Sequence, residues 1–248
     1  MIKVGVLGAN GKMGTQTVAT ITAAADLELV AALDLGDSIE TLKKSGAEVV
    51  VDFTHPDSVM ANLEYAINNG INVVVGTTGF DSAKLAKVKE LLANNPKVGA
   101  LIAPNFGLGA VLMMQFAAQA SKYFESVEIV ELHHPAKADA PSGTAARTAE
   151  LMTQARKDAK LPAAPDATNS GNPAARGGKV GDIPVHSIRL RGLVAHQEVL
   201  LGGPGETLTI RHDSLDRAGF MPGVLLGVRQ VVNHPGLTFG LENFLSGS

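Results

Sequence analysis

The sequence predicts an α/β protein with two domains: a doubly wound parallel sheet, and an α+β domain whose sheet is mixed or antiparallel. Three observations predict this fold class. Short runs of Val, Ile and Leu alternate with amphipathic stretches over the first hundred residues, and a glycine-rich segment directly follows the first run. After about residue 107 the pattern changes, and two apolar runs are joined by a glycine-rich turn. Alternating strands and helices favour parallel pairing, whereas strands joined by a tight turn pair antiparallel.

The composition of the sequence excludes several classes of protein function. A chain of 248 residues with 45% hydrophobic content buries a large core, so we exclude a disordered protein. A net charge of −3 without long Lys/Arg runs argues against nucleic-acid and membrane contacts. The sequence contains no membrane-length apolar run and no recognisable secretory signal, so we expect a cytoplasmic protein that acts on a small molecule. The lack of cysteine excludes thiolate catalysis and Cys-type zinc sites.

Residues 1–106 are expected to form the first domain. Its strands are five buried apolar runs, at 2–7, 27–33, 49–53, 73–75 and 98–102. The amphipathic stretches between them predict helices over 13–24, 58–68 and 82–94. Residues 216–248 are expected to complete this domain with a helix over 222–232 and a short strand near 237–241.

Residues 107–215 are expected to form the second domain. Helices are predicted over 108–123 and 144–157, and strands over 128–132, 185–191, 194–200 and 207–211. The turn Gly202-Gly203-Pro204-Gly205 makes the last two strands a hairpin. Residues 161–182 are rich in Gly and Pro and poor in apolar residues, which predicts an ordered loop or mobile lid rather than a regular element.

The glycine-rich segment predicts a dinucleotide site, which makes the first domain Rossmann-like. GANGKMG at 8–14 follows the first strand and opens the first helix, so the backbone can approach a pyrophosphate at the helix N-terminus. Asp34 ends the second strand, where a carboxylate binds the adenosine ribose and disfavours a 2′-phosphate. Lys12 favours tolerance of that phosphate. We therefore expect NADH and/or NADPH as cofactor, with dual use.

Two other strand ends are candidate cofactor contacts, because ligands of doubly wound sheets bind beyond the carboxyl ends of the strands. GTTG at 76–79 follows one strand and APNF at 103–106 follows the next. Small and hydroxyl residues there allow a nicotinamide ribose and carboxamide to approach the backbone, although ordinary loops have the same composition. His55 follows the preceding strand, and a lone His before Pro is more often a loop residue.

The segment ELHHPAKADAPSGTA at 131–145 is the candidate catalytic segment. Two adjacent histidines on a strand face opposite sides, so one could transfer a proton while the other binds substrate. Ser142 is a plausible N-cap of the following helix, whose exposed amides could hold a carboxylate at Gly143-Thr144. Lys137 adds positive charge and a donor. The alternative is a capped surface helix preceded by two ordinary histidines.

Three other functions use the same features less well. A metal site could take His133, His134 and Asp139 with His186 or His196, but adjacent strand histidines diverge and Lys137 adds a cation, so we expect no metal. A non-catalytic nucleotide sensor would not need the histidines and lysine. A different oxidoreductase acting on a sugar or a semialdehyde would share the first domain, but semialdehyde dehydrogenases need a cysteine nucleophile, which is absent.

Taken together, these motifs resemble bacterial dihydrodipicolinate reductase, and in particular its actinobacterial branch. The resemblance covers essentially the whole chain, from VGVLGANGKMG through VVDFTHP, VVGTTGF and APNFGLGAVL to ELHHPAKADAPSGTA and the run IPVHSIRLRGLVAHQEVLLGGPGETLTIRHDS. It implies NAD(P)H-dependent reduction of 4-hydroxy-tetrahydrodipicolinate, a cyclic dicarboxylate, in lysine and diaminopimelate biosynthesis. It also implies a homotetramer whose second domain binds substrate and tetramerises.

The resemblance also implies individual roles. The proton-transfer pair would be His133 and Lys137, and substrate would be held by His134, Gly143 and Thr144. Cofactor contacts would be made by Gly8, Ala9, Gly11, Lys12, Met13, Asp34, Gly76, Thr77, Thr78, Ala103, Pro104, Asn105 and Phe106. Asn10 stands where close relatives can carry a second lysine, which predicts weaker binding of a 2′-phosphate.

Overall fold

The computed structural model describes residues 1–77 and 79–245. By its internal contacts the chain divides into two units. The first consists of Met1–Leu108 with Arg217–Ser248, and the second is Gly109–Asp216.

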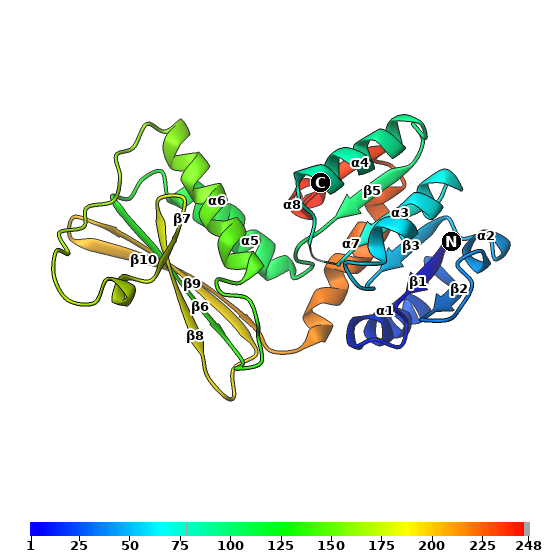
Figure 1. Cartoon of the computed structure of the whole chain (residues 1–248), viewed down its shortest axis with the longest axis horizontal. Coiled ribbons are helices and arrows are strands. Elements are labelled where there is room, and N and C mark those ends of the chain that lie inside the picture. Colours follow the sequence, from blue (N-terminus) through cyan, green and yellow to red (C-terminus); the bar gives the residue numbers. More distant parts are fainter. Residues whose placement is uncertain (78, 246–248) are drawn as a thin grey trace. The chain divides into compact units, whose positions relative to one another are not determined.

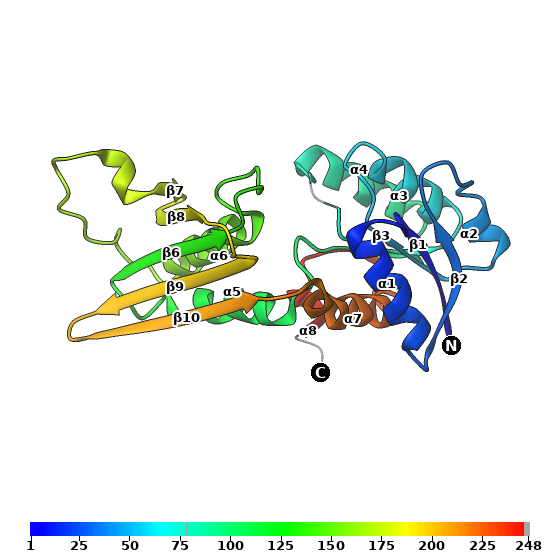
Figure 2. The same cartoon turned by 90° about the horizontal axis from the view of Figure 1, so that it is seen from below.

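The first unit contains a parallel sheet of six strands in the order β11-β5-β4-β3-β1-β2. These are β1 (Ile2–Leu7), β2 (Leu27–Leu33), β3 (Val49–Asp52), β4 (Asn72–Val75), β5 (Gly99–Ile102) and β11 (Gly236–Phe239). The helices are α1 (Lys12–Ala23), α2 (Thr41–Lys44), α3 (Val59–Asn68), α4 (Ser82–Ala93), α7 (Met221–Val231) and α8 (Glu242–Leu245), with a 3-10 turn η2 (Arg217–Phe220). Helices α3 and α4 cover one face and α1 and α7 the other, as Figures 1 and 2 show. The predicted doubly wound parallel sheet is therefore confirmed.

The two covered faces explain why the central strands are continuous apolar runs. All four residues of β3 and of β5 are buried, because side chains on both sides of these strands meet helices. β11, from the end of the chain, pairs in parallel with β5 at the sheet edge. The carboxyl ends of β1, β3, β4 and β5 consequently lie along one edge of the sheet, where the predicted cofactor segments follow them.

The second unit contains a mixed sheet of five strands in the order β10-β9-β6-β8-β7. These are β6 (Ser126–His133), β7 (Gly178–Val180), β8 (Ile183–Arg189), β9 (Ala195–Gly203) and β10 (Glu206–Ser214), with helices α5 (Leu108–Ala120) and α6 (Gly143–Asp158). Ala117 of α5 and Met152 of α6 pack against Ile129 and its neighbours, so both helices cover the same face (Figure 2). β6 and β8 are parallel, whereas β9 pairs antiparallel with β6 and β10. The predicted second, mixed sheet is thus confirmed.

Two details of the second unit differ from the prediction. Residues 161–182 are not wholly irregular, because Asn172 caps a 3-10 turn, η1 (Pro173–Arg176), and β7 follows. Gly177 adopts φ +73, which bends the chain so that β7 can pair antiparallel with β8. The hairpin is present, but its strands extend further than expected, so that Pro204 and Gly205 alone form the turn.

Candidate active site

The turn between β1 and α1 is built for close backbone approach. Gly8 adopts φ +76, and a Cβ there would lie 2.8 Å from the carbonyl oxygen of Phe53. A Cβ on Gly14 would lie 1.9 Å from the carbonyl oxygen of Gly8, so only glycine lets the helix pack on the turn. The first amides of α1, at Lys12 and Met13, have no carbonyl of a preceding helical turn to bond, and no side chain caps this helix, so an anion could bind them. These features fit a pyrophosphate.

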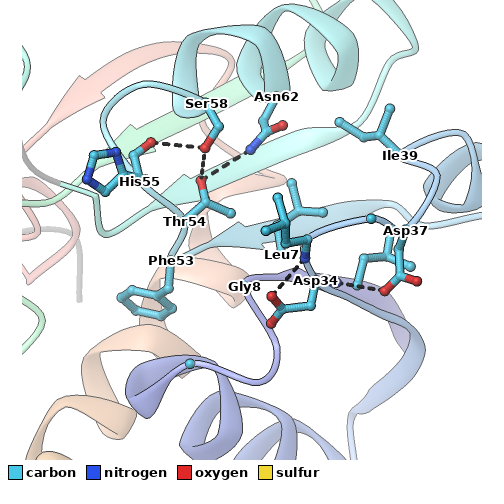
Figure 3. A pocket seen from close by; sticks show the side chains of 14 residues that line it. Leu7, Gly8, Asp34, Asp37, Ile39, Phe53, Thr54, His55, Ser58 and Asn62 are labelled. Carbon is cyan, nitrogen blue, oxygen red and sulfur yellow. Dashed lines mark hydrogen bonds between the residues drawn. The ribbon is translucent and has the colours of Figure 1, made fainter.

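A cavity of about 470 Å³ lies beside this turn at the carboxyl ends of β1, β2 and β3 (Figure 3). Of the predicted cofactor residues, Gly8, Gly11 and Asp34 line it. The other lining residues are Leu7, Leu33, Leu35, Gly36, Asp37, Ile39, Phe53, Thr54, His55, Ser58 and Asn62. The wall is apolar in part and carries two carboxylates, and its size and position suit the adenosine half of a dinucleotide.

Asp34 is held in a fixed orientation at the mouth of the cavity. Its Oδ2 accepts the amide of Asn10 at 2.7 Å, and its Oδ1 accepts the amide of Leu35 at 2.7 Å. Its own amide donates to Asp37 Oδ2 at 2.8 Å. The bonds from Leu35 and Asn10 lower the pKa of the Asp34 carboxyl, which keeps it ionised. Asp34 therefore ties the end of β2 to the glycine-rich turn and still presents a carboxylate to the cavity.

Thr54 on the cavity wall is supported by a buried carboxylate at the end of β3. Asp52 Oδ1 accepts both the amide of Thr54 at 2.8 Å and its hydroxyl at 2.6 Å, and Asp52 Oδ2 accepts Asn62 Nδ2 at 2.9 Å. Burial raises the pKa of Asp52 despite these bonds. His55, which the sequence predicts to be a loop residue, lies on the same wall, and its Nδ1 is 3.1 Å from Asp57 Oδ2.

Among the described residues, the predicted contacts after β4 and β5 do not line this cavity. A Cβ on Gly76 would lie 2.1 Å from the Phe53 ring, which meets Phe106 edge-on at 5.7 Å. Thr77 is buried and its hydroxyl donates to the carbonyl of Thr54 at 3.1 Å, whereas Thr78 lies outside the described residues. Of the remaining predicted positions, the structure buries Ala9 and Ala103, half-buries Met13 and Asn105, and exposes Lys12 and Pro104.

In the second unit, β6 ends at His133, so strand alternation does not extend to His134. The His133 side chain is mostly buried and its Nδ1 lies 2.5 Å from Glu131 Oε2. Glu131, two residues earlier on the same face of β6, is fully buried. His134 is exposed and begins a turn closed by the amide of Lys137, which donates to its carbonyl at 3.2 Å.

Arg189 and Ser142 complete the surroundings of Glu131. Arg189, at the end of β8, donates from Nη1 to Oε2 and from Nη2 to Oε1, both at 2.8 Å. The amide of Ser142 donates to Oε1 at 3.2 Å. Arg189 Nη2 also donates to the carbonyl of Asp139 at 2.7 Å, and Lys137 Nζ lies 2.7 Å from Asp139 Oδ1. A chain of polar contacts therefore links His133, the loop that carries Lys137, and the start of α6.

Helix α6 begins as the sequence predicts. Ser142 is its extended N-cap, and its Oγ accepts the amide of Ala145 at 3.2 Å. A Cβ on Gly143 would meet nothing within 4 Å, so the space in front of the first turn is open. The carbonyl of Thr144 accepts a hydrogen bond from the Thr148 hydroxyl at 2.7 Å, within the first turns of α6. The N-terminus of this 16-residue helix can hold a carboxylate at Gly143 and Thr144.

The electrostatics of this cluster favour a neutral imidazole in the free protein. Burial lowers the pKa of His133 below its ordinary value of 6.5; the Glu131 bond opposes this shift, while the charges of Lys137 and Arg189 add to it. Burial alone would raise the pKa of Glu131, but hydrogen bonds from Arg189, Ser187 and His133 outweigh it and keep the carboxyl ionised.

The sequence predicts the two histidines, the lysine and the helix start as site residues, but it does not predict Glu131 or Arg189. Glu131 alternates with apolar residues along β6, which was a signal that it faces the core. Nothing local marks Arg189, which is 58 positions away from Glu131 in the sequence. Over the described residues 1–77 and 79–245, no group of three or more His, Asp or Glu side chains could hold a metal ion.

Comparison with known proteins assigns both units to one family. A family model described as dihydrodipicolinate reductase, N-terminus, matches residues 2–106, and one described as dihydrodipicolinate reductase, C-terminus, matches residues 109–245. The chain belongs to the dihydrodipicolinate reductase family. The resemblance predicted from the motifs is thereby confirmed.

Relatives within the dihydrodipicolinate reductase family match along their whole lengths. A 4-hydroxy-tetrahydrodipicolinate reductase of Nocardia farcinica is 61% identical, and one of Streptomyces griseus 60% identical; each match covers 98% of both chains. The solved structure of a dipicolinate-bound dihydrodipicolinate reductase from Paenisporosarcina has a TM-score of 0.85 at 38% identity, covering 98% of this chain and 99% of its own. A probable dehydrogenase from Thermotoga maritima, at 9% identity and TM-score 0.67, shares the fold alone. Within the part of the chain that the structure describes, no helix is long and apolar enough to cross a membrane.

Proposed function

We propose that this chain reduces 4-hydroxy-tetrahydrodipicolinate to tetrahydrodipicolinate with a nicotinamide cofactor, in lysine and diaminopimelate biosynthesis. The observation that carries the proposal is segment 131–145, which joins His133, Lys137 and an open helix N-terminus in a chain whose two halves both match the reductase family. The bound cofactor would supply a hydride to the substrate ring, and the reaction balances with one proton taken up and the 4-hydroxyl group lost as water.

The proton-transfer pair in this proposal is His133 and Lys137. Glu131 occupies Nδ1 of His133, so the opposite ring nitrogen, Nε2, is the one left to exchange a proton with substrate. Because burial lowers the pKa of His133, its imidazole is neutral at pH 7 in the free protein. The negative charge of a bound dicarboxylate would favour protonation of His133. The pair thus holds a proton where charge develops on the ring.

The substrate's carboxylate is assigned to Gly143 and Thr144, whose amides open α6. The open space at Gly143 supports this assignment, because a carboxylate can approach the backbone without meeting a side chain. His134, exposed beside the same loop, would bind substrate as a polar side-chain donor.

The function is tested by NADH oxidation with substrate generated from pyruvate and aspartate semialdehyde by the preceding condensing enzyme. Oxidation should require both the condensing enzyme and this protein, and the same should hold with NADPH, because dual use is proposed. A preparation that is folded and binds the cofactor, yet oxidises neither NADH nor NADPH, would refute the activity.

We propose further that NADH is the preferred cofactor. The cavity lining carries Asp34 and Asp37 and no lysine or arginine, so a 2′-phosphate would meet negative charge without a partner on the wall. Lys12 is exposed in the first turn of α1 and would be the source of the remaining NADPH tolerance.

Replacing Asp34 by Ala should therefore change cofactor selectivity. We expect the Kd for NADH to rise roughly tenfold, by loss of the ribose contact and of the bonds to Asn10 and Leu35. The Kd for NADPH should rise less, since a repulsive charge is removed at the same time. Fluorescence titration with both cofactors measures the ratio. Asp57→Ala is the control, because Asp57 pairs with His55 and does not line the cavity. Equal rises for the two cofactors in Asp34→Ala would contradict the ribose assignment.

The proposed assembly is a homotetramer formed through the second unit. Ile188 and Leu200 lie on the face of the mixed sheet opposite the packed helices, because they are paired with Leu132 and Glu128, which alternate with the buried Val127 and Ile129. Both are more than a third exposed, at 40% and 37%. An apolar sheet face of this kind suits pairing with a second copy.

A charge on that face should disrupt the assembly. Leu200→Lys is expected to shift the sedimentation equilibrium mass from four chains to fewer, because burying an added ammonium between apolar sheet faces costs several kcal/mol. Tyr123→Ser is the control, since Tyr123 is 80% exposed and follows α5 outside the sheet. A monomeric wild-type protein, or a Leu200→Lys variant that remains tetrameric, would contradict this interface.

A further inference from the structure

The Glu131 carboxylate of the second unit contacts both parts of the proposed site. It is fully buried, and both of its oxygens are bonded. Oε2 contacts His133 Nδ1 at 2.5 Å and Arg189 Nη1 at 2.8 Å. Oε1 accepts Arg189 Nη2 at 2.8 Å and the amide of Ser142 at 3.2 Å. One carboxylate therefore touches both the proton-transfer histidine and the N-cap of the helix assigned to the substrate carboxylate.

We propose that Glu131 is the positioning residue of the reductase, which sets the tautomer and orientation of His133 and holds the start of α6 in register with it. The inference rests on the proposed function, because it assigns Glu131 a role through His133. Glu131 itself does not touch substrate. Arg189 is the counter-ion that keeps the carboxylate charged in the core.

The tautomer follows from the chemistry of the contact. An ionised carboxylate has only acceptors, so the nitrogen of His133 that faces it must carry hydrogen. Nδ1–H therefore donates to Glu131, and Nε2 of the neutral ring is an acceptor directed away from Glu131. A carboxylate that orients an imidazole in this way favours the imidazolium formed during proton transfer.

The second contact fixes the distance between the two parts of the site. The Ser142 amide bonds Glu131, while the Ser142 hydroxyl caps α6. The N-terminus of α6 consequently cannot shift along β6 without breaking a buried hydrogen bond. Because a small displacement of a bound substrate lowers the rate steeply, this coupling matters for kcat more than for folding.

A similar arrangement on the other face of β6 distinguishes positioning from mere stabilisation. Glu128 also accepts from an arginine and a histidine: Arg176 at 2.5 Å and His186 at 2.7 Å. Those partners belong to η1 and β8 and include no residue assigned to catalysis or binding. Glu128→Gln is therefore a matched control, since it removes the same kind of charge from the same strand.

The test compares Glu131→Gln, Glu131→Asp and Glu128→Gln by kcat, by NADH affinity and by the pH dependence of kcat/KM. We expect Glu131→Gln to lower kcat roughly 100-fold with an unchanged Kd for NADH, Glu131→Asp to lower it less, and Glu128→Gln to stay within about twofold of wild type. NMR of ¹⁵N-labelled histidine, with His133→Ala for assignment, should show the Nδ1–H tautomer in wild type and its partial loss in Glu131→Gln.

Replacing Glu131 and replacing Arg189 should shift the pKa of His133 in opposite directions. The groups that face His133 are Glu131 on β6, Arg189 on β8, and Lys137 with Asp139 on the loop. Glu131 raises the pKa of His133 and Arg189 lowers it. The His133 titration should therefore move to lower pH in Glu131→Gln and to higher pH in Arg189→Gln.

The outcomes separate this inference from the function on which it rests. Loss of activity in His133→Ala together with wild-type kcat and titration in folded Glu131→Gln would overturn the positioning role and leave the reductase assignment intact. Equal losses in Glu131→Gln and Glu128→Gln would also overturn it. If Glu131→Gln does not fold, Arg189→Gln provides the test. An upward shift of the His133 titration in that variant would support the contacts among Glu131, His133 and Arg189 as the positioning device, and an unchanged titration would refute this role.

Discussion

Replacing His133 by Ala is expected to lower kcat by roughly 10²- to 10⁴-fold, the usual contribution of a positioned acid or base. His133 belongs to the second unit, whereas the glycine-rich turn and its cavity belong to the first, so the Kd for NADH should stay within about twofold of wild type. Stopped-flow or steady-state NADH oxidation gives kcat, and fluorescence titration gives Kd.

Lys137→Ala should lower kcat to a similar extent, because Lys137 is assigned to the same proton-transfer pair. If His133 and Lys137 act as one unit, the double variant should lose little more than either single variant. His186→Ala is the control, since this histidine also bonds a glutamate on β6 but faces the other side of the sheet. Wild-type kcat in either His133→Ala or Lys137→Ala would refute the assigned pair.

Gly14→Ala is expected to produce the second large effect, on cofactor binding. The added methyl group would lie 1.9 Å from the Gly8 carbonyl oxygen and 2.8 Å from the Ala9 Cα, and both of these are backbone atoms. The helix must therefore move away from the turn, at a cost of about 1–3 kcal/mol for an overpacked site. A displacement of the α1 amides from the pyrophosphate should raise the Kd for NADH by at least roughly tenfold.

Thermal unfolding and NADH titration of Gly14→Ala measure the two consequences. Gly219→Ala is the matched control, because its Cβ would meet nothing within 4 Å and its φ is not in the left-handed region. The control should keep both Tm and Kd. A Gly14→Ala protein with wild-type Kd would show that the helix N-terminus does not form the pyrophosphate site.

The parallel sheet was predictable because its strands carry their own signal. Helices on both faces bury every residue of β3 and β5, and such strands appear in the sequence as unbroken apolar runs between amphipathic stretches. β7 carried no such signal. Its three residues are exposed or half-buried, and they form a strand only because Gly177 turns the chain back toward β8. Pairing that depends on a distant strand leaves little trace in local sequence.

The candidate site was predictable only where its residues are adjacent in sequence. His133, Lys137 and the Ser142 cap lie within ten positions, so their proximity follows from a strand, a short loop and a helix start. The buried pair of Glu131 and Arg189 joins β6 to β8, and its geometry depends on the register of two strands. Sequence periodicity determines which face a side chain occupies, but not which distant partner neutralises its charge.

The origin of the hydrogen added to the substrate ring tests the proposed reduction directly. Wild-type protein would convert substrate generated from pyruvate and aspartate semialdehyde, using NADH deuterated at the transferring position of the nicotinamide, and the product would be read by mass spectrometry and NMR. We expect one deuterium on a product ring carbon for each NADH oxidised. Product that carries no cofactor-derived deuterium, or NADH that remains unoxidised while bound to folded protein, would contradict the proposed reduction.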